Sequence, residues 1–375
     1  MINSLLIGVA FLAAGLGPAA GVRASGIGSA FESADGPYLY VANQASASVT
    51  VIDVMTDEVV RTIDLTRLGF SENAKPHHVV VEPDGSAFYV SLIGDGFVLK
   101  LTPAGDLLGR AAFETPGMLA LDPHSDQLWV GRSMMAVSPP QRIGRIERSD
   151  MSIDEVDVFF DRPHALALSP DGRYVYTASL AGNDIAIIDP VEERVELLKV
   201  PGPTHVFVQF AVSPDGSTLV TGGEMSGKLL VFGLEDPMRP KMITEIEVNP
   251  MPWHPVFSPD GSHLYFGNRG ANTVTVVRSS DWSVEAVIED AAFAEPHGSA
   301  ISPDGRKLYI SNRNVKDPAA DDEGMNHGAM AHAGAAPGAE RLGRVTVIDT
   351  ATLEVMETID VGQYAAGMGT SVPPR

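Results

Sequence analysis

The sequence contains no cysteine, and this absence removes several kinds of chemistry. A chain without thiols forms no disulfide, no thiolate zinc site and no iron–sulfur cluster, and it has no cysteine nucleophile. The chain is also poor in basic residues: 26 Lys and Arg stand against 48 Asp and Glu, for a formal net charge of −22. A surface of this sign repels nucleic acid, whose binding requires neutralisation of phosphates. We therefore expect no nucleic-acid partner.

The motifs of several large enzyme classes are also missing. No G-x-S-x-G nucleophile turn, phosphate-binding loop or dinucleotide fingerprint occurs in the chain. Carboxylates are abundant, but many of them lie in turn motifs, where a structural role is expected. Hydrolytic or nucleotide-dependent catalysis is therefore not indicated, and we lean towards a protein that is not an enzyme.

Long apolar runs are absent except near the N-terminus. Residues 1–24 have an apolar centre followed by small residues, with Val22 and Ala24 at the positions that precede a signal-peptidase cleavage site. The alternative interpretation is a retained membrane anchor, but Gly15, Gly17 and Pro18 interrupt the run. We predict a signal peptide over 1–24, a periplasmic or extracellular location and no membrane contact after cleavage.

The rest of the chain repeats a short turn motif. A Pro-Asp-Gly turn, or its variant at Pro123, recurs from Pro83 to Pro303 at intervals of 40 to 47 residues. Apolar strand patterns such as "AFYVSL", "YVYTAS" and "KLYISN" follow these turns. Four short strands in each period of this length are typical of a β-propeller blade.

The two ends of the repeat region predict how the propeller closes. The region begins at 38–65 with three strands of a blade and ends at 362–372 with one more strand. If the C-terminal strand completes the N-terminal blade, the ring contains seven blades and exposes no open sheet edge. We therefore predict an all-β, seven-bladed propeller over 38–372.

The repeats carry a family resemblance. "YVANQASASVTVIDVMTDEVVRTIDL", "YVYTASLAGNDIAIIDP" and the "SPDG" turns resemble the YVTN family of β-propeller repeat proteins. The likeness covers nearly all of 38–372 and implies a propeller that is often exported. It implies little about function, because propellers support many activities.

Six of the ten histidines fall at the start of an inner strand, in five different blades. Five of them lie five or six residues before the turn proline of their blade, and the sixth follows a similar Gly-Pro-Thr segment. The two remaining blades have Gly117-Met118 and Gly367-Met368 there instead. The six are His77, His78, His164, His205, His254 and His297.

This distribution predicts a metal site where the inner strands begin. Neutral imidazole is the commonest protein ligand for transition metals, and inner strands converge on the propeller axis. The alternative is that each histidine only caps its own turn. Neighbouring residues of a regular strand point to opposite sides, so His77 and His78 cannot both face the axis unless the strand is irregular there.

A long insertion adds soft ligands on the same face. In the last blade the loop between the second and third strands extends over 312–344 and contains the pattern M-x-H-x-x-M-x-H. Thioether combined with imidazole favours copper, and zinc is the alternative. Another interpretation is a disordered segment rich in Ala and Gly. The predicted ligands here are Met325, His327, Met330 and His332.

The histidine pattern has a second resemblance. Adjacent histidines on one inner strand and single ones on others are similar to the propeller domain of nitrous oxide reductase, in which such histidines hold a copper–sulfur cluster. The resemblance implies that the six inner-strand histidines are metal ligands. The chain departs from that enzyme because it has no cysteine-bearing electron-entry domain, so we expect metal storage, delivery or sensing.

Two other functions are compatible with the sequence. One is a non-catalytic scaffold that binds a protein or glycan, and the other is a haem-binding or redox propeller. A scaffold is expected to contain no metal after purification, which distinguishes it from a metal-binding protein. A haem-binding propeller is expected to show a visible absorption band. We expect a monomer whose partner is a metal ion, with another exported protein as a further candidate.

Overall fold

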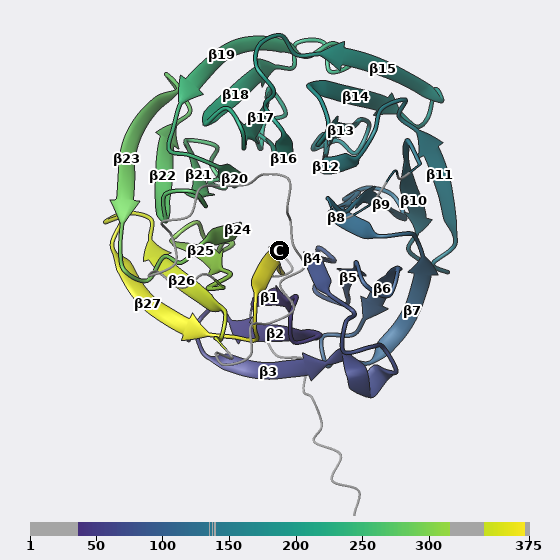
Figure 1. Cartoon of the computed structure of the whole chain (residues 1–375), viewed down its shortest axis with the longest axis vertical. Coiled ribbons are helices and arrows are strands. Elements are labelled where there is room, and N and C mark those ends of the chain that lie inside the picture. Colours follow the sequence, from purple (N-terminus) through teal and green to yellow (C-terminus); the bar gives the residue numbers. More distant parts are fainter. Residues whose placement is uncertain (1–36, 135, 137, 139, 316–340, 372–375) are drawn as a thin grey trace, which may run out of the picture. The chain divides into compact units, whose positions relative to one another are not determined.

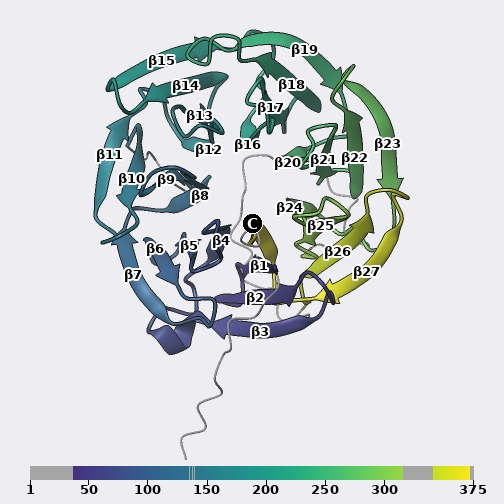
Figure 2. The same ribbon diagram turned by 180° about the vertical axis from the view of Figure 1, so that it is seen from behind.

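The computed structural model describes residues 37–134, 136, 138, 140–315 and 341–371, which lie in one compact unit, Asp35–Arg375. The described backbone forms seven four-stranded antiparallel sheets, arranged as blades around an axis (Figure 1). Figure 2 shows the same ring from behind, with the first strand of each blade again innermost. The predicted all-β, seven-bladed propeller is confirmed.

The two inner layers of the ring contain the strands closest to the axis. The innermost strands are β4 (Pro76–Val81), β8 (Pro116–Leu121), β12 (Pro163–Leu168), β16 (Phe207–Val212), β20 (Pro252–Phe257), β24 (Pro296–Ile301) and β28 (Ala365–Thr370). The second strands are β5 (Phe88–Leu92), β9 (Gln127–Arg132), β13 (Val175–Ser179), β17 (Thr218–Gly223), β21 (His263–Asn268), β25 (Lys307–Asn312) and β1 (Tyr38–Asn43).

The two outer layers complete each blade. The third strands are β6 (Phe97–Leu101), β10 (Arg142–Glu147), β14 (Asp184–Asp189), β18 (Lys228–Gly233), β22 (Thr273–Arg278), β26 (Arg344–Asp349) and β2 (Ser48–Asp53). The outermost strands are β7 (Leu107–Ala112), β11 (Ile153–Asp157), β15 (Arg194–Lys199), β19 (Lys241–Glu247), β23 (Ser283–Glu289), β27 (Val355–Asp360) and β3 (Val59–Asp64).

The hydrophobic core lies between neighbouring blades. Second and third strands are covered on both faces by the next sheets, so they are buried almost throughout, including the serine and threonine positions of β2 and β22. Tyr40 of β1 and Phe88 of β5 show this packing, because their rings stack at 4.4 Å between the first two blades. The outermost strands alternate between exposed and partly buried positions, as expected for a sheet with one free side.

The Pro-Asp-Gly segments form the turns between first and second strands. In one of them the Ser258 hydroxyl donates to Asp260 Oδ1 at 2.6 Å, and Asp260 Oδ1 also accepts the backbone N–H of Ser262 at 3.0 Å. Gly261 completes the turn with a positive φ of 73°. These hydrogen bonds lower the pKa of Asp260 to about 2, and the bond from the Ser258 side chain contributes most. The aspartates of this motif therefore act as turn-forming residues.

The C-terminal strand closes the ring. β28 pairs with β1 in an antiparallel register that places Gly369 opposite Tyr40 and Met368 opposite Val41. The predicted closure is therefore confirmed. A second contact links the first and last blades: Asp57, in the turn after β2, accepts from Lys307 Nζ at 2.6 Å and from the Tyr309 hydroxyl at 2.9 Å.

We expect Asp57→Ala to destabilise the closed ring. The substitution leaves the partly buried ammonium of Lys307 and the buried hydroxyl of Tyr309 without this acceptor, which costs about 2 kcal/mol of unfolding free energy. Urea denaturation measures the loss, and Tyr309→Phe should lose only about 1 kcal/mol because the ion pair remains. An Asp57→Ala protein as stable as the parent would contradict a closing role for these contacts.

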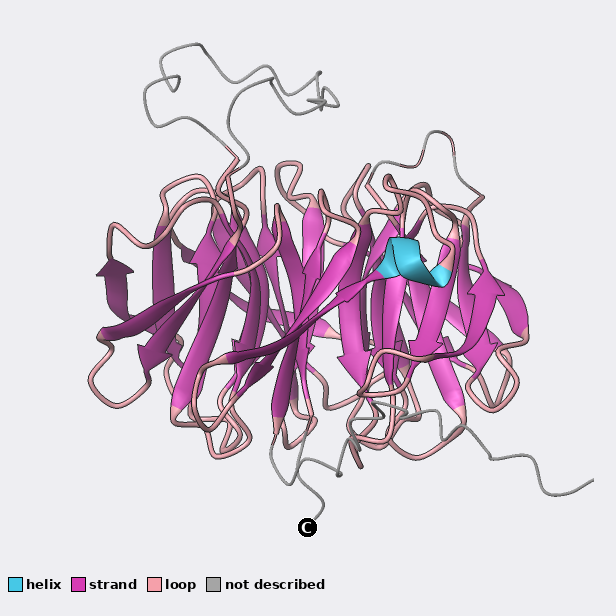
Figure 3. Ribbon diagram, turned by 90° about the horizontal axis from the view of Figure 1, so that it is seen from below, coloured by secondary structure: helices cyan, strands magenta, loops and turns pink. Residues whose placement is uncertain are grey.

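The loops gather at two opposite faces of the ring (Figure 3). We call the face at which the inner strands begin the histidine face, and the face with the Pro-Asp-Gly segments the turn face. The short 3-10 helix η1 (Leu65–Leu68) lies between β3 and β4 on the approach to the histidine face. Of the helices in the described part of the chain, none has the length and apolar character needed to cross a membrane. The predicted signal peptide, 1–24, lies outside the described residues.

Candidate functional site

A recurrent backbone feature turns the inner strands towards the axis at the histidine face. The residue just before each inner strand has a left-handed φ, as in Lys75 at 53°, Met251 at 60° and Glu295 at 56°. The pairing with the second strand then shifts register, between Pro76 and Val79 in the case of β4. Such a bulge places extra residues opposite the partner strand and changes where their side chains point.

The rings of five histidines contact one another around the axis. His77 lies 5.9 Å from His164 and 5.7 Å from His297, measured between ring centroids. His254 lies 4.9 Å from His297 and 6.2 Å from His78. All five side chains are buried. The irregular start of β4 therefore allows both of its adjacent histidines to reach histidines of other blades.

The two adjacent histidines differ in their hydrogen bonds. His77 Nδ1 lies 3.2 Å from Gln44 Oε1, so Nδ1 carries the proton and Nε2 carries the lone pair. His78 Nδ1 instead accepts the backbone N–H of Leu119 at 3.3 Å, which places its proton on Nε2. His77 is therefore prepared to act as a ligand through Nε2, whereas the lone pair of neutral His78 is already used.

Three of the five rings contain a buried nitrogen without a hydrogen-bond partner: His77 Nε2, His254 Nε2 and His297 Nδ1. Buried polar atoms are paired in most proteins, so three unpaired nitrogens on contacting rings require an explanation. His164 is oriented in a similar way to His77, because its Nδ1 donates to the carbonyl oxygen of Arg132 at 2.7 Å and its Nε2 keeps the lone pair.

Burial keeps these imidazoles neutral. Desolvation lowers the pKa of His78 to about 3 and that of His164 to about 4. The pKa values of His77, His254 and His297 are also held well below the ordinary value, first by burial and then by neighbouring histidines. The five rings therefore present lone pairs and N–H groups at neutral pH, and no positive charge.

His254 has an additional sign of a constrained site. Its own φ is 45°, in the left-handed region that residues with a Cβ seldom occupy. A residue held there costs of order 1–3 kcal/mol, and such residues concentrate at functional sites.

The sixth predicted histidine, His205, is held differently. It precedes β16, its Nδ1 lies 2.9 Å from the Ser226 hydroxyl, and its ring stacks on Phe207. No ring contact joins it to the other five histidines among the described residues. Val208 and Gln209 occupy the shifted part of β16 instead. β16 has six residues like the other inner strands, and His205 lies two residues before its first residue, outside the common position.

Glycine replaces histidine in the blade of β28 because no side chain fits there. A Cβ on Gly367 would lie 2.6 Å from the carbonyl oxygen of His77 and 2.7 Å from Cδ2 of His78. Met368, beside it, packs into a core between blades, as does Met118 of β8. The glycine therefore permits the close approach of β4 to β28.

Gly367→Ala should accordingly displace the adjacent histidines. We expect a loss of about 1–3 kcal/mol of unfolding free energy, because backbone and ring must both move to admit the methyl group. Gly182→Ala is a matched control, since the atoms nearest to the new Cβ are side-chain ends there, Asp184 Oδ2 at 2.7 Å and Lys199 Nζ at 3.6 Å. Urea denaturation of both variants tests this, and equal stability would show that β4 and β28 adapt without strain.

Aromatic and basic side chains that the sequence prediction missed surround His297. Trp253 lies 4.8 Å from its ring and Tyr364 lies 6.5 Å away. Arg269 lies over the ring of Trp253 and Arg313 lies over that of Tyr364. The signal for the arginines was an Asn-Arg pair after the second strand in two consecutive blades, "GNRG" and "SNRN".

The methionines divide between described and undescribed parts of the chain. The predicted ligands in the 312–344 insertion, Met325, His327, Met330 and His332, lie outside the described residues. Met134 and Met251 are described, and they pack against the small apolar group that contains Trp253. Thioethers therefore lie near the aromatic side chain that contacts His297.

The ring nitrogens of the described histidines do not point at one common position. No group of three or more His, Asp or Glu side chains in the described ranges is already arranged to hold a metal ion. Two imidazoles bound to one metal ion at about 2.0–2.1 Å have ring centroids roughly 5 Å apart. The centroid separations of 4.9 Å and 5.7 Å around His297 are close to that requirement. Ring rotation would be needed to bring the lone pairs together.

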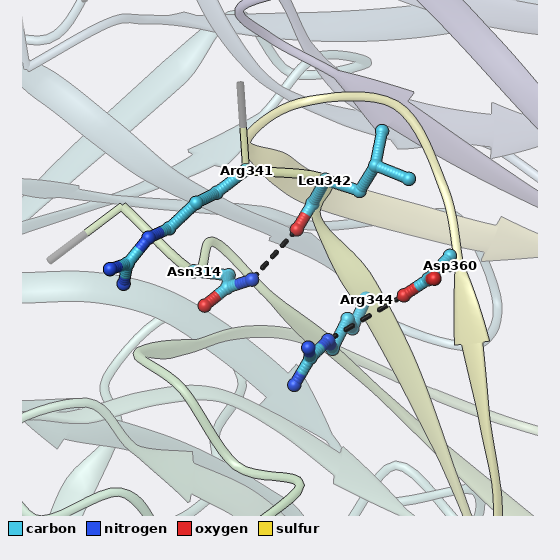
Figure 4. Close-up of a pocket in the computed structure, with 5 residues that line it drawn as sticks. All are labelled: Asn314, Arg341, Leu342, Arg344 and Asp360. Atoms are coloured by element: carbon cyan, nitrogen blue, oxygen red, sulfur yellow. Dashed lines mark hydrogen bonds and ion pairs between the residues drawn. The ribbon is translucent and has the colours of Figure 1, made fainter. Parts of the chain in front are cut away.

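A surface pocket lies at the base of the insertion (Figure 4). It has a volume of about 320 Å³ and is lined by Asn314, Arg341, Leu342, Arg344 and Asp360. Its polar groups bond to one another: Asn314 Nδ2 donates to the carbonyl oxygen of Leu342 at 2.8 Å, and Arg344 pairs with Asp360 at 3.5 Å. None of the six described inner-strand histidines lines this pocket.

The comparisons with known proteins support the fold. Hydrazine synthase of Kuenenia stuttgartiensis is similar with a TM-score of 0.60 and 18% identity, over 77% of this chain and 87% of that chain. A functionally unknown protein from Desulfotomaculum acetoxidans is similar with a TM-score of 0.68 and 12% identity, over 90% of this chain and 99% of that one. No protein-family model and no curated protein matches the chain. At these identities the likeness concerns the propeller fold alone.

Proposed function

We propose that this propeller is an exported protein that binds a transition metal ion through inner-strand histidines and serves in metal storage, delivery or sensing. The candidate ligands among the described residues are His77, His254 and His297, with His164 as a fourth. Copper is the preferred ion and zinc the alternative.

The observation that carries the proposal is the set of three unpaired ring nitrogens on His77, His254 and His297. A metal ion would use the lone pairs of such nitrogens and would remove the cost of burying them without partners. A purely structural role predicts that these atoms find protein partners instead, as Nδ1 of His78 does.

The surrounding hydrogen bonds support the same role. Gln44 and the carbonyl oxygen of Arg132 hold Nδ1 of His77 and His164, which leaves Nε2 of each ring as the donor atom. Metal-binding histidines are commonly oriented by a carbonyl or carboxylate on their other nitrogen. Neutral imidazole is also the form that binds a metal, so no proton has to leave these buried rings.

The donor chemistry favours copper. Imidazole suits both copper and zinc, whereas thioether sulfur favours Cu(I). Met134 and Met251 pack near Trp253, which itself contacts His297. The proposed capture arm, with Met325, His327, Met330 and His332, stays a prediction.

Two alternatives are less well supported by the described residues. Haem is a large planar group, whereas the five rings lie within 4.9–6.2 Å of their neighbours and would have to separate to admit it. The scaffold hypothesis gains support from exposed apolar side chains on outermost strands, such as Leu108, Leu197 and Ile243. These residues lie on the rim of the ring and are compatible with metal binding at the axis.

Elemental analysis of protein exported to the periplasm tests the proposal. We expect about one copper ion per chain after expression with added copper, and stoichiometric rebinding after treatment with a chelator. Zinc titration under the same conditions measures the preference between the two ions. A content below about 0.1 metal ion per chain, with no saturable binding of either ion, would overturn the proposal.

A further inference from the structure

Two arginines occupy equivalent positions in neighbouring blades at the histidine face. Arg269 directly follows β21, and Arg313 directly follows β25. The backbone N–H of Arg269 donates to the carbonyl oxygen of Met251 at 3.0 Å, and that of Arg313 donates to Glu295 at 3.2 Å. Each arginine is thus anchored to the residue that precedes the inner strand of its own blade.

Both guanidinium groups lie over aromatic rings. Arg269 is 4.8 Å from the centroid of Trp253, and Arg313 is 4.1 Å from that of Tyr364. Stacking on an aromatic face fixes the plane of a guanidinium and leaves its edge available for hydrogen bonds. Because both aromatic rings contact His297, the two cations border the same part of the site.

Part of the hydrogen-bonding capacity of these groups is left unused by the described residues. Nε of Arg269 and Nε of Arg313 are both buried and lack a hydrogen-bond partner. Arg269 has two ion pairs, to Glu224 at 3.6 Å and to Glu295 at 4.0 Å, and both are longer than ordinary hydrogen bonds. No hydrogen bond or ion pair within the described ranges engages the guanidinium of Arg313.

The positive charge of Arg313 lowers the pKa values of neighbouring basic groups. Burial is the main cause that lowers the pKa of Arg269, and the charge of Arg313 is the second. The same charge also helps to lower the pKa values of His77 and His297. A partly buried cation with an unpaired, buried N–H group is stabilised by an anion that can accept from that group.

We propose that Arg313 and Arg269, stacked on Tyr364 and Trp253, form a binding site for a small oxyanion at the histidine face. The planar fork of arginine matches a carboxylate in a bidentate arrangement, so small carboxylates are the expected class, with phosphate as the related oxyanion. The site does not depend on a metal ion. Because the chain is strongly acidic overall, with a net charge of −22, binding relies on these short-range contacts.

Calorimetric titration of the chelator-treated full chain with malonate, and separately with inorganic phosphate, tests the site at constant ionic strength. We expect saturable malonate binding with a Kd below about 1 mM. Arg313→Gln should weaken it at least about tenfold, and Arg313→Lys should weaken it as well because an ammonium has no planar fork. Tighter binding of phosphate than of malonate would overturn the choice of a carboxylate.

The matched control is Arg306→Gln, which changes an 84% exposed arginine on the turn face and should bind malonate like the parent chain. Thermal unfolding establishes that each variant is folded. His164→Leu separates the two proposals, since it should weaken metal binding and leave malonate binding unchanged. No saturable binding by the parent chain, or equal binding by folded Arg313→Gln, would overturn the oxyanion site.

Discussion

Replacement of His297 by leucine should abolish tight metal binding and leave the metal-free protein at least as stable as before. His297 is the central ring, in contact with both His77 and His254, so its loss removes one donor and separates the other two. We expect copper affinity to fall at least about 100-fold, which exceeds the usual effect of losing a residue that only orients a ligand.

The stability of the same variant separates a functional from a structural histidine. His297 Nδ1 is buried without a partner, and leucine of similar size removes that polar atom. The metal-free variant should therefore unfold at the same temperature as the parent chain or a higher one. Copper in 100-fold excess over Kd should stabilise the parent chain by about 2.7 kcal/mol and should not stabilise the variant.

Calorimetric copper titration and thermal unfolding with and without copper measure both effects. His263→Leu is the matched control, because His263 lies by the turn face, where it pairs with Glu285 at 3.2 Å. Copper affinity in His297→Leu equal to that of the parent chain would contradict the assigned ligand. A large loss of stability in the metal-free variant would indicate that the histidine serves the fold.

Mild acid should unfold the metal-free protein. Five histidines are buried in the neutral form, and their folded-state pKa values lie below the unfolded value of about 6.5. Below that pH the unfolded chain binds protons that the folded chain does not bind, so stability falls as the pH falls. The loss continues until the folded groups titrate, near pH 4 for His164 and near pH 3 for His78.

The size of this effect is large compared with ordinary protein stability. Each such histidine lowers the free energy of unfolding by about 1.4 kcal/mol per pH unit below its unfolded pKa, or by about 2 kcal/mol at pH 5. Several of them together approach the 5–15 kcal/mol that stabilises a typical folded domain. We therefore expect acid unfolding with a midpoint near pH 5. Circular dichroism, recorded in the presence of a chelator, measures this midpoint.

A double variant supplies the control for the acid effect. His164→Leu with His254→Leu removes two groups that take up protons only on unfolding, so the midpoint should move to lower pH. Bound copper should move it in the same direction, because protons compete with the metal for the same nitrogens. A midpoint unchanged in the double variant would show that carboxylates, and not the buried histidines, control acid stability.

The blade architecture could be predicted because its signals are local. Each Pro-Asp-Gly turn depends on neighbouring residues, as the bonds from Ser258 and Ser262 to Asp260 show. Each strand is marked by its own apolar pattern, and repetition of the pattern establishes the number of blades. Closure followed from incomplete repeats at the two ends, and the pairing of β28 with β1 confirms it.

The arrangement of the site could be predicted only in part. Counting residues back from the turn prolines placed five histidines at the axis, and their rings do contact one another. The Gly-Pro-Thr segment before it suggested that His205 belonged with them, but β16 begins at Phe207 and the position is filled by Val208 and Gln209. The same register shift occurs in other blades, so what differs here is where the strand begins, two residues after His205.

By itself the sequence determined the repeat, the seven blades, the acidic charge and the absence of thiol chemistry, because composition and short-range turn and strand patterns carry this information. Only the tertiary structure decided that both His77 and His78 reach other histidines, that three ring nitrogens lack partners, and that Arg269 and Arg313 border His297. These relationships join residues of different blades, far apart in the chain, and they arise only when the ring closes and each bulge orients its side chains around one axis.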